Sequence, residues 1–213
     1  MIDWSWKRAG EALPVLWQGF QITLLATLLG FLLAAALGLL IAVARRAAPR
    51  WISVPVHAVA EFVRLTPIVV QLLFAYALLP QFTALSIGIA VLGVHYSTYM
   101  AEVYRAGIDD VPKGQWEAAR ALSLSPARTW RAVILPQAIR RSIPALGNNA
   151  VSMFKDTPYL FTITVVELVT AAQQYGASKF AYLEAITMAG AFFLAASYPT
   201  SVLIRRLEKR LVY

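Results

Sequence analysis

The side chains of this chain that could do chemistry are charges set within long apolar segments. Lys155 and Asp156 are adjacent in such a segment, and Thr157-Pro158 follows them directly. Neighbouring residues on a helix point about 100° apart, so these two charges are poor partners for each other. A broken helix with both charge signs is how membrane transport sites hold zwitterions. Two interpretations remain open: contact with a solute or its pathway, and an ion pair with a neighbouring helix.

A second set of polar residues combines opposite charges with a helix break. Glu61 and Arg64 are three residues apart, the spacing at which side chains meet on one helix face. Pro67, directly after Thr66, removes a backbone hydrogen bond and bends the helix. This segment is either a kinked helix at the inner face of a substrate pathway or a cytoplasmic-end salt bridge with a packing kink.

Glu167 and His95 are further polar residues in apolar surroundings. Glu167 lies toward the outer end of its segment, where it either lines an external gate or faces interfacial water. His95 has no second His or Cys cluster beside it, so no metal site is expected.

Motifs of bond-making chemistry are missing from the sequence. With no Cys, disulfides and thiolate catalysis are excluded. No phosphate-binding Gly-x-x-x-x-Gly-Lys-Ser/Thr loop, Gly-x-Ser-x-Gly elbow or His-Glu-x-x-His helix is present. We therefore predict no catalytic residue, no bound cofactor and no ATP site in this chain.

Composition identifies the elements that must position these residues as membrane helices. Of 213 residues, 59% are hydrophobic and 14% are charged, and the mean hydropathy is +0.62. Soluble domains average about 45–50% apolar and about 25% charged residues. The net charge of +8 therefore has a topological use and does not indicate nucleic acid as a partner.

Five segments are long enough to cross a bilayer, which takes about 20 apolar residues. They are residues 15–43, 54–79, 85–106, 145–171 and 183–204. The sequence thus predicts an all-α membrane protein with five transmembrane helices in a single domain, residues 1–213. Five helices leave little room for a pore, so two such subunits are expected to face each other.

Basic residues predict the orientation of these helices. They are concentrated in the loop 45–50, the segment 107–142 and the tail 205–210. Because cytoplasmic loops carry the excess of Lys and Arg, these three regions are expected in the cytoplasm. The N-terminus is then outside, as an odd number of spans requires.

The segment 109–136 between the third and fourth spans reads as two short helices. Pro112 and Gly114 favour a type I turn, after which residues 115–122 form the first helix. Ser125 as N-cap and Pro126 at the first helical position begin the second, and Pro136 stops or kinks it.

Such a pair of helices beneath a membrane bundle makes a knob that enters a groove on another protein. The small side chains of Ala118 and Ala119 would let the partner approach closely, and Glu117 would cap helical amides or pair with a basic partner residue. The alternative is an amphipathic helix lying at the lipid headgroups.

The spacing of this segment resembles the EAA loop of ABC importer permeases, which reads Glu-Ala-Ala, three residues, Gly, nine residues, Ile, one residue, Leu-Pro. Here the matching residues are Glu117, Ala118, Ala119, Ser123, Val133, Leu135 and Pro136. The spacing is intact, but Ser123 stands where Gly is usual, so we expect the turn to differ in detail. The resemblance implies an ATPase-docking surface made by Trp116, Glu117, Ala118, Ala119, Arg120, Ser123, Leu135 and Pro136.

The resemblance covers nearly the whole chain and extends to the polar amino acid permeases, which serve histidine, arginine, glutamine and similar solutes. Arg64-Leu65-Thr66-Pro67 is similar to their Arg-Gly-Thr-Pro segment. Within that group the chain looks most like the ectoine/hydroxyectoine permease of the D type. The segments that carry this likeness are residues 95–99, 101–108, 153–158, 163–168 and 205–210.

The resemblance implies the type I ABC importer permease fold with a cytoplasmic coupling helix, in a bacterial inner membrane. Two permease subunits, identical or different, would form the pathway, an ATPase dimer would bind and hydrolyse ATP, and an extracytoplasmic solute-binding protein would deliver the solute. Arg64, Thr66, Pro67, Lys155, Asp156 and Glu167 are the candidate pathway residues. A stand-alone channel or an intramembrane enzyme is the alternative of another class.

Overall fold

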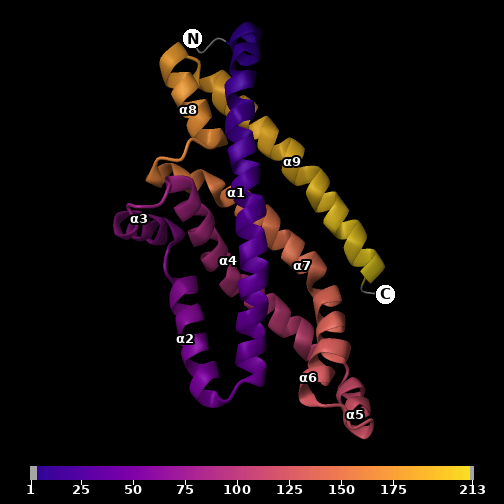
Figure 1. The fold of residues 1–213 in the computed structure, drawn as a ribbon. Helices are drawn as coiled ribbons and strands as arrows, with labels where there is room; N and C mark the ends of the chain where they lie inside the picture. The colour runs from indigo at the N-terminus through magenta and orange to yellow at the C-terminus, as the bar shows by residue number, and fades with distance from the viewer. Residues whose placement is uncertain (1–3, 212–213) are drawn as a thin grey trace.

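The structure is a computed structural model that describes residues 4–211, and it is helical throughout its ordered elements (Figure 1). Three long helices, α1, α4 and α9, are accompanied by shorter pieces. In chain order the elements are α1 (Trp6–Ala47), α2 (Arg50–Leu65), α3 (Ile68–Leu78), α4 (Ala84–Asp109), α5 (Lys113–Ala121), α6 (Pro126–Arg128), the π-helix η1 (Thr129–Ile134), α7 (Leu135–Asp156), the 3₁₀-helix η2 (Thr157–Ile163), α8 (Leu168–Lys179) and α9 (Tyr182–Leu211).

Small residues at four-residue spacing allow α1 to pack closely on α4. The buried face of α1 carries Gly30, Ala34, Gly38 and Ala42, and such residues let two membrane helices approach to backbone contact. A Cβ atom added at Gly38 would lie 2.8 Å from the Cβ of Met100 and 3.0 Å from a backbone oxygen of α4. The α1–α4 pair is therefore the centre of the bundle.

A second apolar cluster joins the N-terminal half of α1 to α7, α8 and α9. Aromatic rings provide much of it: Phe20 lies 5.2 Å from Phe192 and Phe154 lies 4.9 Å from Phe193, measured between ring centroids. Tilted and edge-on pairs at these separations stabilise packing beyond the apolar area that they bury.

The predicted span 54–79 is two helices in the structure, because the chain breaks at Thr66-Pro67. The axes of α2 and α3 differ by 104°. Gln71 compensates for the break: its side-chain amide donates to the carbonyl of Val63 at 2.7 Å and to that of Thr66 at 2.9 Å. The Pro67 kink expected from the sequence is thus a full change of direction.

The predicted span 145–171 is also interrupted. It comprises the second half of α7, the 3₁₀-helix η2, a non-helical stretch at 164–167 and the first residues of α8. Thr164 has a left-handed backbone with φ 69°, and the hydroxyl of Thr23 on α1 accepts a hydrogen bond from the amide of Leu168. The break after Lys155-Asp156 lies where Thr157-Pro158 predicts it.

Among residues 4–211, α1, α4 and α9 are each long and apolar enough to cross a membrane, and the bent α2–α3 pair makes a fourth such segment. The remaining predicted span, residues 145–171, is not among these segments, because α7 carries polar residues and the span is interrupted. The termini of α1 and α4 that are rich in charge lie at the same end of the molecule as α5 and α6 (Figure 1).

Candidate functional site

A loop of residues 110–125 joins α4 to α6. It contains the short helix α5 and a tight turn after it, and we call it the α5 loop. Ser123 has φ 50°, the left-handed conformation for which glycine is the usual residue. The amide of Leu124 donates to the carbonyl of Ala119 at 3.0 Å, and the amide of Ser123 to that of Arg120 at 2.9 Å. These two bonds end α5 as a Schellman motif does, so serine adopts the conformation that the EAA pattern assigns to glycine.

We predict that Ser123→Gly stabilises the folded protein by roughly 1 kcal/mol. A left-handed conformation costs a non-glycine residue roughly 1–2 kcal/mol, and the extra freedom of glycine in the unfolded chain offsets about half of that gain. Thermal unfolding of the two purified proteins in detergent, followed by circular dichroism, measures the difference. A lower midpoint for the glycine variant would show that Ser123 is held without strain.

Glu117, Ala118 and Arg120 are exposed on α5, as are Lys113, Gly114, Gln115 and Ala121. Ala119 is buried within the chain, with 2% of its surface exposed, so the expectation that both alanines meet a partner is wrong for Ala119. Trp116 is half-buried and packs edge-on against Trp130, with ring centroids 5.4 Å apart and planes at 84°. This contact fixes α5 against η1 and leaves Glu117, Ala118 and Arg120 exposed.

The second short helix does not stop at Pro136, so of the two predicted outcomes, a stop and a kink, the stop is wrong. Ser125 caps α6 by accepting from the amide of Arg128, and α6, η1 and α7 then follow one another without a gap. Pro136 lies at the start of α7, two residues after the π-helix η1 ends, so the change of helix type lies next to this proline. Leu135 and Pro136 therefore lie within a continuous helical rod, α6–η1–α7, that runs from Pro126 to Asp156.

Two further features join α5 to its surroundings. The side-chain amide of Gln137 on α7 donates to the side-chain oxygen of Gln115 at 3.3 Å. A cavity of about 490 Å³ lies between α5 and the ends of α1 and α4. It is lined by Arg46, Ala47, Asp109, Val111, Lys113, Trp116, Glu117, Arg120 and Trp130.

The break between α7 and η2 brings Asp156 to α4. The hydroxyl of Tyr96 donates to Oδ2 of Asp156 at 2.6 Å, and Asp156 is half-buried whereas Lys155 is exposed. Tyr96 in turn packs against the rings of His95 and Tyr99, at 5.8 and 5.9 Å between centroids. Asp156 is thus held against α4 by Tyr96, while the adjacent ammonium group of Lys155 is exposed.

The α2–α3 break carries the second polar group of the pathway prediction. Arg64 donates to both carboxylate oxygens of Glu61, at 2.6 and 2.7 Å, which confirms the predicted pair. Both side chains are about one-third exposed. Thr66 and Pro67 form the bend itself, and the side-chain amide of Gln71 lies 3.1 Å from Nδ1 of His95, which links this bend to the helix that carries Tyr96.

Glu167 is completely buried, so it faces neither interfacial water nor a gate, and both interpretations of this residue are corrected. Its carboxylate accepts from the amides of Val169 and Thr170 and from the Thr170 hydroxyl, each at 2.8 Å. It is the N-cap of α8, a position where a carboxylate satisfies amides that have no partner within the helix.

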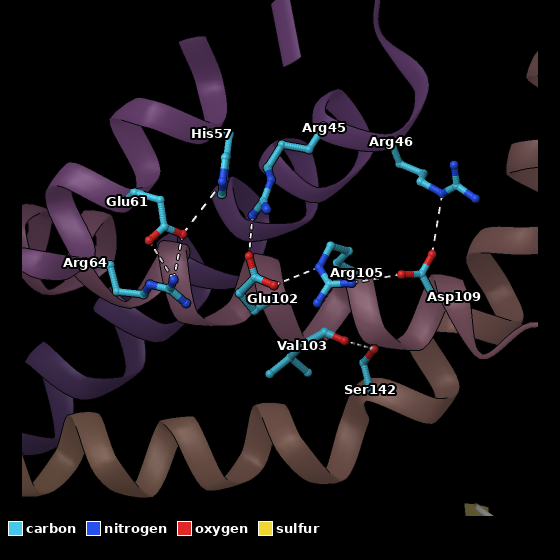
Figure 2. Close-up of polar contacts among 10 residues, drawn as sticks. All are labelled: Arg45, Arg46, His57, Glu61, Arg64, Glu102, Val103, Arg105, Asp109 and Ser142. Carbon is cyan, nitrogen blue, oxygen red and sulfur yellow. Dashed lines mark hydrogen bonds and ion pairs between the residues drawn. The ribbon is translucent and has the colours of Figure 1, made fainter. Parts of the chain in front are cut away.

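Sequence reasoning missed an ionic cluster at the C-terminal ends of α1 and α4 (Figure 2). Glu102 of α4 pairs with Arg45 of α1 and with Arg105 of its own helix, and Asp109 pairs with Arg105 and Arg46. The available signal was the spacing of 102, 105 and 109, which places them on one face of the third span. Arg45, the partner of Glu102 on α1, is 57 residues away from it, which no local pattern reveals.

The chain resembles known transport proteins over almost its full length. Residues 34–213 match the family described as binding-protein-dependent transport system inner membrane component. The chain is 45% identical to a probable amino-acid ABC transporter permease protein, y4tG, of Sinorhizobium fredii, over 93% of this chain and 88% of that one. It is 36% identical to the glutamine transport system permease protein GlnP of Escherichia coli, over 99% of both chains.

Solved structures agree with these relatives. A crystal structure of an amino acid ABC transporter with histidines superposes with a TM-score of 0.89 at 31% identity, covering 99% of this chain and 100% of that one. An inward-facing MetNI methionine ABC transporter shares the fold alone, with a TM-score of 0.74 at 19% identity. Nothing in these likenesses favours a stand-alone channel or an intramembrane enzyme. The chain therefore belongs to the binding-protein-dependent transport system inner membrane components, and it is a type I ABC importer permease, a transport subunit whose ATPase activity resides in a separate partner.

Proposed function

We propose that this chain forms the pathway of an importer for small zwitterionic solutes, with polar amino acids as the solute class. The observation that carries the proposal is the continuous rod α6–η1–α7, which joins the α5 loop at one end to Asp156 at the other. The relatives are named for amino acids and glutamine, which favours an amino acid over ectoine or hydroxyectoine. An ectoine is also a small zwitterion, so it belongs among the solutes tested.

The α5 loop is the docking element for the ATPase. Glu117, Ala118 and Arg120 present a small, charged surface that a groove on the partner accepts, while Trp116 and Ala119 face the chain. Ser123 sets the turn after α5. Leu135 and Pro136 begin α7, the part of the rod that carries the movement toward Asp156. When the ATPase subunits close on ATP, displacement of α5 shifts this rod and the polar break above it.

The two interrupted helices, at Thr66-Pro67 and at Thr157-Pro158, supply the solute contacts. Asp156 would meet the ammonium group of a zwitterion, and Lys155 or Arg64 its carboxylate, because opposite charges in a low-dielectric site attract strongly. Thr66 and Pro67 shape the neighbouring bend, and Tyr96 keeps Asp156 in place by its hydrogen bond.

Assembly and orientation complete the proposal. Two permease subunits, identical or different, face each other, two ATPase subunits bind from the cytoplasm, and an extracytoplasmic solute-binding protein delivers the solute. The basic loop 45–50, the segment 107–142 and the tail 205–210 lie in the cytoplasm, and the N-terminus lies outside. The multi-pass protein is placed in the inner membrane of a bacterium.

Uptake in a transport-deficient strain tests this function. The strain expresses the permease together with its ATPase and solute-binding protein, and it receives radiolabelled L-glutamine, L-histidine, L-arginine or ectoine, each with the others as competitors. We expect ATP-dependent uptake of at least one amino acid. Uptake without the ATPase would contradict an importer, and uptake restricted to ectoine would overturn the solute class.

A further inference from the structure

Five charged side chains from α1 and α4 form one alternating series beside the α5 loop (Figure 2). Arg45 pairs with Glu102, whose other oxygen accepts from Nε of Arg105 at 2.8 Å. Arg105 also donates to Asp109 at 2.9 Å, and Asp109 lies 3.5 Å from Nε of Arg46. The first and last members are adjacent in α1, so the series closes on itself through the backbone.

Burial makes one contact of this series more important than the others. The side chains of Arg45 and Glu102 are 14% and 26% exposed, whereas those of Arg46 and Asp109 are 55% and 45% exposed. Ion pairs in water contribute little to stability, but removing one partner of a shielded pair leaves the other charge unpaired in a poorly solvated place. Glu102 is the carboxylate that joins α1 to α4 in the shielded part.

The charged series lies at the residues that lead into α5, which links the Arg45–Glu102 contact to the movement of α5. Asp109 is the last residue of α4, and α5 begins at Lys113. On the opposite side, Arg141 of α7 contacts both the backbone carbonyl and the carboxylate of Asp110, and the hydroxyl of Ser142 lies 3.4 Å from the carbonyl of Val103. Asp109 and Asp110, which lead into α5, are thus held by α1 on one side and by α7 on the other.

We propose that Glu102 is a positioning residue for energy coupling: with Arg45 it holds α1 to α4, so that displacement of α5 moves these helices together. This inference rests on the proposed function. Glu102 lies outside the exposed face of α5 and outside the Asp156 site, so it acts through the helices that it joins. A glutamine at this position retains the shape but presents an amide beside two guanidinium groups and provides no anion for Arg45.

The experiment uses the complete importer, permease with ATPase and solute-binding protein, in proteoliposomes. The solute is a radiolabelled mixture of L-glutamine, L-histidine and L-arginine, and the readout is the number of ATP molecules hydrolysed per solute imported. We expect Glu102→Gln and Arg45→Gln each to raise this ratio about fivefold or more, the scale of typical coupling between sites. The double variant should be no worse than either single one, because both remove the same pair.

Two variants separate coupling from general damage. Glu102→Asp restores the anion and should recover most of the wild-type ratio, and Glu208→Gln, an exposed carboxylate on α9, should leave the ratio unchanged. An unchanged ratio in Glu102→Gln overturns the inference. So does an equal fall of uptake and ATPase activity with loss of the assembled complex on size-exclusion chromatography.

A distance measurement reports directly on the contact between α1 and α4. Because the chain has no native Cys, spin labels attach only at Ala47→Cys and Ala106→Cys, two exposed positions near the ends of α1 and α4. We expect the distance distribution to broaden in Glu102→Gln, and an unaltered distribution contradicts the role. If the wild-type importer neither imports nor hydrolyses ATP, the proposed function fails; if it does both and Glu102→Gln stays coupled, only this inference fails.

Discussion

Charge reversal at Glu117 is expected to abolish uptake while the permease remains inserted in the membrane. Glu117 is exposed on α5 beside Ala118 and Arg120, so Glu117→Lys changes the surface presented to the ATPase without disturbing packing. Placing like charges together at an interface costs several kcal/mol, which predicts a fall in uptake of about 100-fold or more. Stimulation of ATP hydrolysis by the loaded solute-binding protein should be lost with it.

The matched control is Glu208→Lys, the same substitution at an exposed position of α9. Membrane fractions are assayed for insertion, and copurification with the ATPase measures docking. Full uptake by Glu117→Lys, at a membrane level equal to wild type, would remove α5 from the docking surface. Deletion of residues 115–122 extends the test, since the docking proposal requires loss of uptake there too.

Neutralising Asp156 is the second substitution with a large expected effect. In Asp156→Asn the hydrogen bond from Tyr96 retains an acceptor, but the negative charge that would meet a solute ammonium group is gone. Hydrogen bonds to charged groups contribute about 1.5–3 kcal/mol, so uptake at low solute concentration should fall by roughly 10-fold to 100-fold. Assembly with the ATPase should survive, because the site is distant from α5.

Tyr96→Phe separates charge from position at this site. It removes the hydroxyl and keeps the carboxylate, so we expect a smaller loss than in Asp156→Asn. Concentration series of labelled amino acid uptake give the half-saturating concentration and the maximal rate of each variant. Unchanged kinetics in Asp156→Asn would exclude this carboxylate from the pathway and leave it as a helix–helix contact between α4 and α7.

Local chemistry explains which parts of the fold the sequence predicts well. The chain bends at Thr66-Pro67 and changes helix type at Thr157-Pro158, since proline removes a backbone donor wherever it occurs. Ser125 caps α6 for an equally local reason. The same rule misjudges Pro136, because the π-helix η1 precedes it and the helix continues through it into α7.

Contacts between distant residues account for what the sequence does not predict. The sequence alone does not show that α8 begins at Leu168, so it does not show that Glu167 is the N-cap of that helix. Arg45 and Glu102 belong to separate spans, and only the close packing of α1 on α4 brings them together. Ala119 faces inward for a similar reason, since the direction of α5 is set by Trp116 against Trp130.

Gln71 stabilises the elbow between α2 and α3 from inside the bend. Its side-chain amide serves the carbonyls of both Val63 and Thr66, and straightening the elbow would move these carbonyls away from it. Each such hydrogen bond contributes about 0.5–1.5 kcal/mol, and Pro67 has no N–H to offer the Val63 carbonyl in a straight helix. We therefore expect α3 to keep its direction relative to α2 when the importer changes conformation.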